Sequence, residues 1–438
     1  MRRARFPVRS AVLVVVPLCV ALTGTEAMAA PGQLDTSFGI DGKVTTNFTG
    51  GHDPASSIAI QDDGKVVAVG TANYRGTDAK FALARYESTG ILDPTFGGNG
   101  KVLTNFTGAW DGAFSVAIQS DGRIVVVGEA GGSGPVETAG ARFALARYDT
   151  EGALDATFGG DGKVTTNLSS GADFGFGVAI QAEDGKIVVT GRAGGSGGRI
   201  ALVRYNANGS LDATFGDNGK VTTNLTRRDD RADDLAIQAD GRIVVAGTAN
   251  YFSNGARFAL VRYDPDGSRD KTFSADGIVT TDVTPTFDGA FGVAIQPTDG
   301  KILAAGQAGG GDAGRIGLVR YETNGALDDT FGGDGKVTTN FTAALDYADD
   351  VAIQPDGRII AAGAIRFFGP DARFALVRYE TNGALDDTFG GDGKVTTDLG
   401  AARGGIFDVD IQPSDGKIVA VGVAGGGGGR FGLARYLP

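Results

Sequence analysis

Aspartate residues recur at one position of a repeated motif. The pair Ile-Gln occurs seven times, and an aspartate stands eight residues before six of the glutamines: Asp53, Asp111, Asp173, Asp230, Asp288 and Asp346. A ring of carboxylates would bind a hard cation, and calcium takes several oxygen ligands, so this position is a candidate calcium site. In the alternative interpretation, each aspartate accepts hydrogen bonds from the backbone amides of its own turn. A sevenfold ring would also hold neighbouring carboxylates far apart, which favours this alternative.

Other residue patterns exclude several kinds of chemistry. The segment Asp264-Pro-Asp266-Gly267 has the spacing of a calcium loop but lacks the glutamate at position 12 of a complete loop, so it is interpreted as a turn. His52 is the only histidine and Cys19 the only cysteine, which leaves a serine triad or a cysteine nucleophile without partners. A hydrolase or lyase that uses carboxylates, with or without a metal ion, stays open as the alternative function.

Large aromatic residues are predicted in loops that differ between the repeats. They are Tyr74, Trp110, Tyr251, Phe252, Phe367 and Phe368. Exposed aromatic side chains in such loops favour contact with a protein or a glycan, while burial against neighbouring loops is the alternative.

A second variable position stands five residues before each repeated glutamine. Four repeats have phenylalanine there (Phe114, Phe176, Phe291 and Phe407), and the other three have Ser56, Asp233 and Asp349. A repeat carries an aromatic residue either at this position or in the loop after its second strand, never at both. The two positions are therefore predicted to face the same space.

Short strands must position these residues. Each repeat contains four candidates, which in the second repeat are Ser115–Gln119, Arg123–Val127, Arg142–Tyr148 and Lys163–Leu168. Asp121-Gly122 predicts a two-residue turn with positive φ at both positions. The continuous β-branched run before Gly128 predicts a strand buried on both faces, and Arg142–Tyr148 alternates with period 2. The mature chain contains no amphipathic helical pattern, so the predicted class is all-β.

The spacing of the repeats predicts the architecture. Successive glutamines are 58, 62, 57, 58, 58 and 58 residues apart. Four antiparallel strands repeated seven times fit a seven-bladed β-propeller, with a parallel β-helix as the competitor. A strand of the fourth type lies near the beginning, and one of the third type lies at the end. We expect Gly42–Phe48 to pair with Arg430–Tyr436 and close the ring.

The repeated text RFALARY, G-x-LD-x-TFGG-x-GKV and VAIQ-x-DG-[KR]-I-V resembles the delta-60 repeat, a bacterial β-propeller repeat of exported and surface proteins. The resemblance covers nearly all of the mature chain and implies architecture and export, but no reaction. One copy departs from it at Arg269-Asp270-Lys271 and at Ser274–Ile278.

Residues 1–29 have the features of a secretory signal peptide, namely basic residues, an apolar run at Ala11–Leu22 and Ala27-Met28-Ala29 before the cleavage site. Cleavage after Ala29 removes four Arg and one Glu, so the net charge of −12 becomes −15. We therefore expect a secreted protein, located outside the cell, in the periplasm or at the cell surface, with residues 30–438 forming the propeller. Its acidity argues against nucleic acid as a partner, and we expect a monomer without a membrane span or disulfides.

The connections after the second and fourth strands of each repeat vary, and in a propeller they emerge on one face, here called the variable face. The preferred interpretation is a binding or scaffold module that uses this face, because loops on a rigid scaffold carry most binding sites. The alternative is the hydrolase or lyase, acting at the mouth of the central channel.

Overall fold

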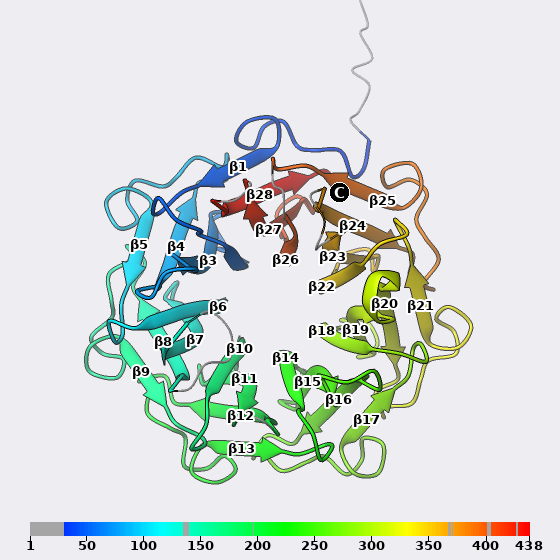
Figure 1. Ribbon diagram of the computed structural model, residues 1–438, viewed down its shortest axis with the longest axis horizontal. Coiled ribbons are helices and arrows are strands. Elements are labelled where there is room, and N and C mark those ends of the chain that lie inside the picture. Colours follow the sequence, from blue (N-terminus) through cyan, green and yellow to red (C-terminus); the bar gives the residue numbers. More distant parts are fainter. Residues whose placement is uncertain are drawn as a thin grey trace, which may run out of the picture.

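The computed structural model describes residues 30–134, 140–195, 197–366, 369, 371–400, 404–425 and 428–438. These residues form a ring of seven four-stranded antiparallel sheets around a central channel (Figure 1). The predicted seven-bladed propeller is therefore confirmed. The described residues contain one short 3-10 helix, η1 (Gly311–Ala313), and no α-helix. Within the same ranges, no helix has the length and apolarity that crossing a bilayer requires.

The strands of every blade follow the same order from the channel outward. The innermost strands are β2 (Ala55–Ile60), β6 (Trp110–Ile118), β10 (Asp173–Ile180), β14 (Arg231–Ile237), β18 (Asp288–Ile295), β22 (Asp346–Ile353) and β26 (Ile406–Ile411). The second strands are β3 (Val66–Ala72), β7 (Ile124–Gly132), β11 (Ile187–Ala193), β15 (Ile243–Ala249), β19 (Ile302–Ala308), β23 (Ile359–Ile365) and β27 (Ile418–Ala424). The third strands are β4 (Lys80–Tyr86), β8 (Arg142–Tyr148), β12 (Arg199–Tyr205), β16 (Arg257–Tyr263), β20 (Arg315–Tyr321), β24 (Arg373–Tyr379) and β28 (Arg430–Tyr436). The outer strands are β5 (Lys101–Thr104), β9 (Lys163–Thr166), β13 (Lys220–Thr223), β17 (Ile278–Thr281), β21 (Lys336–Thr339), β25 (Lys394–Thr397) and β1 (Lys43–Thr46).

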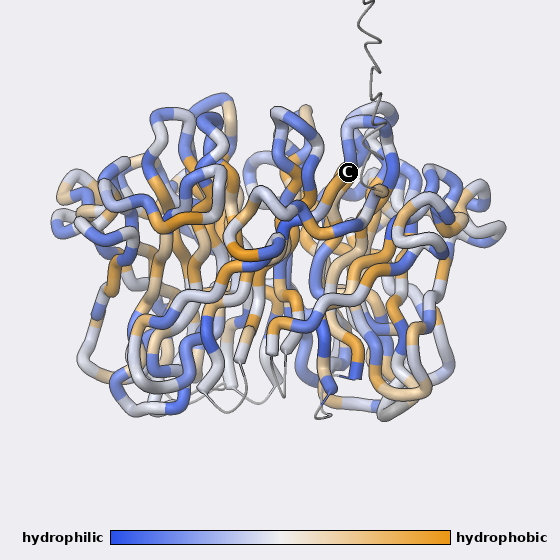
Figure 2. Tube along the Cα trace, turned by 90° about the horizontal axis from the view of Figure 1, so that it is seen from above, coloured by the Kyte–Doolittle hydropathy of each residue, from blue (hydrophilic) through white to orange (hydrophobic). Residues whose placement is uncertain are grey.

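The core lies between the blades. Strands β3, β11, β15, β23 and β27 are buried at every position, as the continuous apolar runs predict. In β8 the period-2 alternation divides the side chains between two cores: Ala144, Ala146 and Tyr148 face the preceding blade, while Phe143 and Leu145 face the next one. Apolar residues therefore concentrate along the strands, and hydrophilic residues in the connecting loops (Figure 2).

The ring closes as the sequence predicts. Strand β1 pairs antiparallel with β28, with Val44 opposite Leu433, so that the last blade takes its outer strand from the N-terminal part of the chain. The Tyr436 hydroxyl also donates a hydrogen bond to Thr397 of the preceding blade, 2.8 Å away. This closure leaves no unpaired strand at the junction.

The hairpin turn after each innermost strand differs from the prediction. In β6–β7, the amide of Gln119 donates to the carbonyl of Arg123, so the loop contains three residues. Gly122 has φ of 82°, whereas Asp121 does not have a positive φ. The aspartate instead accepts a hydrogen bond from the Arg123 amide through its side chain, at 3.1 Å. The turn thus needs one glycine, and its aspartate acts as a turn-capping side chain.

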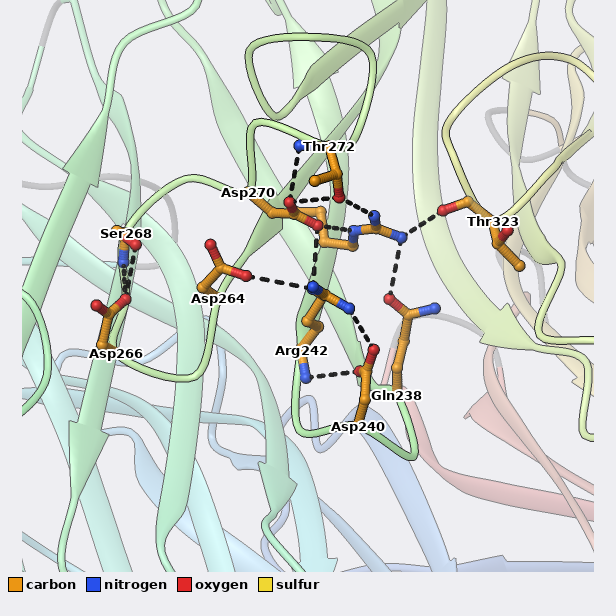
Figure 3. Close-up of polar contacts among 10 residues, drawn as sticks. Gln238, Asp240, Arg242, Asp264, Asp266, Ser268, Asp270, Thr272 and Thr323 are labelled. Atoms are coloured by element: carbon orange, nitrogen blue, oxygen red, sulfur yellow. Dashed lines mark hydrogen bonds and ion pairs between the residues drawn. The ribbon is translucent and has the colours of Figure 1, made fainter.

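An arginine near the end of each third strand joins adjacent blades. In β16, Arg262 Nε donates to Asp270 Oδ2 at 2.7 Å. Its Nη1 donates to Gln238 and to the carbonyl of Thr323 in the next blade (Figure 3). The guanidinium lies 4.6 Å from the ring centre of Phe273. The other six Arg–Asp pairs are Arg85–Asp93, Arg147–Asp155, Arg204–Asp212, Arg320–Asp328, Arg378–Asp386 and Arg435–Asp35.

The segment with calcium-loop spacing forms part of this network. Asp266 Oδ1 accepts hydrogen bonds from the backbone amide and the hydroxyl of Ser268, at 2.8 and 2.7 Å. Asp264 Oδ1 forms an ion pair with Arg242, which also pairs with Asp240 (Figure 3). These contacts are those of a turn stabilised by ion pairs.

Candidate functional site

The six repeated aspartates lie at the variable face, and their side chains point into the loops. Each is completely buried. Asp53, for example, accepts hydrogen bonds from the amides of Phe48 and Thr49 and from the Thr49 hydroxyl, at 2.6 to 2.9 Å. It also accepts one from the amide of Asn73 in the loop that follows β3, at 2.8 Å. The carboxylate therefore joins the two variable loops of its blade.

The contacts with the preceding loop recur at the other five positions, Asp111, Asp173, Asp230, Asp288 and Asp346. The bond from the loop after the second strand recurs at the first four of these. Nearly all the oxygen lone pairs that calcium would need already accept hydrogen bonds from the protein. Among the described residues, no group of three or more His, Cys, Asp or Glu side chains is arranged to hold a metal ion. Calcium binding stays a prediction, while the contacts give these carboxylates a structural role.

Every innermost strand contains a β-bulge at the variable position five residues before the glutamine. The pairing register shifts across this residue in all seven blades, for instance between Ala290 and Gly292 in β18. A bulge leaves one residue unpaired and redirects its side chain. The seven bulge residues are Ser56, Phe114, Phe176, Asp233, Phe291, Asp349 and Phe407, and all are half-buried and line one cavity.

A glycine on the second strand makes each bulge possible. In β23, a Cβ at Gly363 would lie 2.1 Å from the Tyr347 carbonyl oxygen and 2.6 Å from Ala348 Cα. The six counterparts would place a Cβ 1.8 to 2.1 Å from the equivalent carbonyl oxygen: Gly70, Gly128, Gly191, Gly247, Gly306 and Gly422. Real Cβ atoms do not approach backbone oxygen so closely, so only glycine fits opposite the bulge.

The cavity has a volume of about 970 Å³ and lies at the mouth of the channel on the variable face. Its wall is largely aromatic. The rings of Phe114 and Phe176 are 5.5 Å apart, and Phe291 meets Tyr347 edge to face at 6.3 Å. Loop residues from β3–β4 and β15–β16 complete the rim. The cavity therefore has the concave, mostly apolar character of small-ligand sites.

The predicted aromatic residues have three different placements. Tyr74, Tyr251 and Phe252 line the cavity, and Phe252 is 66% exposed. Because Tyr74 and Tyr251 share this cavity with the bulge phenylalanines, the two variable positions do face the same space. Trp110 is 1% exposed, and its Nε1 donates to the Tyr74 carbonyl at 2.9 Å, so it is buried against the neighbouring loop, which is the alternative that the sequence left open. Phe367 and Phe368 lie outside the described residues.

Few charged groups face the cavity. Arg231 Nε and Asp233 Oδ1 form an ion pair of 2.5 Å. Burial raises the pKa of Asp349 well above its usual range. The charge of Asp233 also raises it, while Arg231 and a hydrogen bond from Tyr347 oppose this shift. Burial and the charge of Arg75 lower the pKa of His52, while the charge of Asp53 opposes this shift.

Further carboxyl groups lie along the innermost strands and join neighbouring blades. Asp234 Oδ2 accepts a hydrogen bond from the Val293 amide at 2.9 Å, and Asp410 Oδ2 accepts one from the Ile60 amide at 3.1 Å. Burial raises the pKa of Asp234 to about 7, with a smaller contribution from the charge of Asp408. Burial likewise raises the pKa of Asp410 to about 6. These groups therefore bind protons more tightly in the folded chain than in the unfolded one.

We predict maximal stability at about pH 4 to 5. The contribution of Asp234 and Asp410 is fully present below their unfolded pKa of 3.8 and is lost as the pH rises through about 6 to 7. Asp35 behaves in the opposite way: burial alone would raise its pKa, but hydrogen bonds from Ser37 and Lys417 lower it to about 2. Its contribution is present above pH 3.8 and is lost as the pH falls to about 2.

Urea denaturation at pH 2.5, 4.5 and 8 would measure this profile. Asp234→Asn should flatten the slope between pH 4.5 and 8 while leaving the acid side unchanged. A free energy of unfolding that is higher at pH 8 than at pH 4.5 would contradict the raised pKa values of Asp234 and Asp410.

Sequence patterns singled out the bulge position as variable but did not identify it as a bulge. A signal was present: Ala290 and Val293 are three residues apart, yet both lie in the same core cluster. Alternating strand residues place positions i and i+2, not i and i+3, on one face. Two core residues that are three positions apart in one strand, with a glycine in the next strand, would have indicated a bulge that redirects the side chain at position 291.

Solved structures with a similar fold include virginiamycin B lyase from Staphylococcus aureus, with a TM-score of 0.52 and 12% identity over 90% of this chain and 98% of that chain. Another is an ulvan lyase of polysaccharide lyase family PL25 bound to -[GlcA(1-4)Rha3S]-, with a TM-score of 0.51 and 14% identity over 90% of this chain and 95% of that chain. Such low identities establish a likeness of fold alone. No curated protein is significantly similar to the chain in sequence.

A family model matches seven segments of the chain, one in each repeat. The segments are 61–96, 119–158, 182–215, 238–273, 298–331, 354–389 and 414–438. Together they cover more than half of the chain, and their spacing follows the blades, which is consistent with the resemblance to delta-60 repeats. The chain therefore belongs to the family described as "Domain of unknown function (DUF5122) beta-propeller".

Proposed function

We propose that the protein is an exported ligand-binding propeller whose ligand occupies the cavity at the mouth of the channel. The observation that carries this proposal is the convergence of all seven bulge residues on one cavity. The scaffold keeps seven glycines and seven bulges, while the bulge residue itself varies between Phe, Ser and Asp. A repeated frame with a varied, inward-pointing side chain is what a binding site requires. Export is proposed from the signal peptide pattern of residues 1–29.

Ligand-detected saturation-transfer NMR on the mature chain tests this function. The compounds are methyl glycosides of neutral sugars, acetylated amino-acid amides and small alkylamines. We expect at least one class to give signals with the wild-type protein and to lose them with Phe291→Ala, which removes a ring from the cavity wall. Ile91→Ala is the matched control, because Ile91 is 67% exposed in the β4–β5 connection on the opposite face. Binding that survives Phe291→Ala, or no binding by any class, would contradict the proposal.

A carboxylate-dependent hydrolase or lyase is the second candidate. The observation that favours it is the difference between two carboxyl groups of one cavity: Asp233 is paired with Arg231, whereas burial raises the pKa of Asp349 well above its usual range. Such a pair can supply a base and an acid. Turnover of chromogenic aryl glycosides that Asp349→Asn abolishes would support this candidate over simple binding.

A further inference from the structure

Two blades, those of β14 and β22, each have an aspartate as the bulge residue, and the blade of β14 shows what such a carboxylate binds. In β14, Arg231 precedes Asp233 by two residues and forms the ion pair with it. The Arg231 guanidinium carbon lies 4.2 Å from the ring centre of Phe176, the bulge residue of the preceding blade. It also lies 5.2 Å from the ring centre of Tyr251. A guanidinium thus sits against aromatic rings and a carboxylate, a favourable arrangement for a cation.

The corresponding place in β22 has the same frame without the cation. Asp349 is the bulge residue, and Phe291 of the preceding blade takes the place of Phe176. Tyr347 stands where β14 has Arg231, and its ring meets Phe291 edge to face. Its hydroxyl donates a hydrogen bond to Asp349, while Asp349 Oδ2 has no hydrogen-bond partner among the described residues. The blade therefore presents a carboxyl group and aromatic rings to the cavity but no positive charge of its own.

On the basis of the proposed function, we infer that the cavity binds an organic cation, a guanidinium or ammonium group on a flexible chain, at Asp349 beside Phe291 and Tyr347. The ligand would complete in β22 the contact that Arg231 makes in β14. The cavity, at about 970 Å³, has room for such a group and its aliphatic chain.

Binding of a cation has a consequence that a neutral ligand lacks. Asp233, Asp408, Arg231 and Tyr347 are the charged and titratable groups that act on Asp349. Burial and the charges of Asp233 and Asp408 raise the pKa of Asp349, while Arg231 and the hydrogen bond from Tyr347 lower it. A positive charge beside the carboxyl favours its ionised form, so binding should release a proton.

Isothermal titration calorimetry of the mature protein at pH 7 tests this inference with two isosteric probes. Acetyl-arginine methylamide carries the guanidinium, and acetyl-citrulline methylamide has the same shape without the charge. We expect the arginine probe to bind at least tenfold more tightly and, in two buffers of different ionisation enthalpy, to show proton release on binding. Agmatine has the guanidinium group but no peptide groups, so it distinguishes a free amine ligand from a peptide side chain. An affinity equal to that of the arginine probe indicates a free amine ligand, and a weaker affinity indicates a peptide side chain.

Three variants complete the experiment. Asp349→Asn, an isostere of the protonated side chain, should lower the affinity for the arginine probe at least tenfold and abolish proton release. Phe291→Leu should weaken binding while proton release persists. Asp371→Asn removes an exposed charge from the β23–β24 loop, on the variable face, and should change neither. If the two probes bind equally well, the cation assignment is overturned and the proposed function stands. The same holds if neither probe binds while neutral sugars bind in the cavity. If no compound binds in the cavity, both the cation assignment and the proposed function are overturned.

Discussion

Replacing Gly363 by alanine should lower the free energy of unfolding by about 3 kcal/mol, because the new Cβ would overlap the innermost strand. The contacts are with backbone atoms, the Tyr347 carbonyl oxygen at 2.1 Å and Ala348 Cα at 2.6 Å, so no side-chain rotation can relieve them. The bulge before Asp350 would have to shift, and with it the side chain of Asp349. Urea denaturation measures the loss.

Gly50→Ala is the matched control for this substitution. Gly50 is exposed, no atom lies within 4 Å of a Cβ built on it, and its φ is not positive. Its replacement should change the free energy of unfolding by less than about 0.5 kcal/mol. If the two variants unfold at the same urea concentration, the glycine is not required by the bulge.

Removing the carboxylate of Asp328 should cost about 3–5 kcal/mol, because it leaves a buried arginine without its partner. Asp328 is 1% exposed and accepts hydrogen bonds from Arg320 Nε at 2.6 Å and from Lys301 Nζ at 2.8 Å. Burial alone would raise its pKa, but the bonds from Lys301, Thr330 and Arg320 lower it far below the usual range. Asp328→Ala thus removes the carboxylate that pairs with Arg320, whose Nη1 donates to the Thr381 carbonyl of the next blade, and thermal unfolding should show a lower midpoint.

The neighbouring Asp329 provides the control. It is exposed, and its replacement by alanine removes the same charge from the same turn. Asp329→Ala should leave the midpoint nearly unchanged. A similar loss in both variants would show that the turn, not the buried ion pair, determines the effect.

The sequence predicted those parts of the fold that follow from local patterns. Continuous β-branched runs indicated the buried second strands, and the period of 58 residues indicated the blades. The ring closure between β1 and β28 followed from the order of strand types. The pairing of Arg262 with Asp270 was also predictable, because both recur at a fixed spacing in six repeats, while Arg435 of the last repeat pairs with Asp35 across the ring closure.

The site was less accessible from the sequence because its geometry depends on exceptions to strand periodicity. The repeated aspartates looked like ligands, yet their oxygens accept hydrogen bonds from two loops, and for Asp53 one of the donors, Asn73, lies twenty residues further along the chain. The bulge residues were recognised as variable, but strand alternation alone does not aim them at the channel. For Trp110 the sequence left exposure and burial against a neighbouring loop both open, and the structure buries it beneath Tyr74.

Blocking the cavity from within tests most directly whether it is the ligand site. Residues 30–438 contain no cysteine, so Ser56→Cys provides a single thiol at a bulge position that lines the cavity. A bulky maleimide adduct at this thiol should eliminate the saturation-transfer signals of every compound that binds. The same adduct on Ser120→Cys, in the exposed turn between β6 and β7, should leave them intact. Signals that persist unchanged after modification at position 56 would place binding outside the cavity and contradict the proposed function.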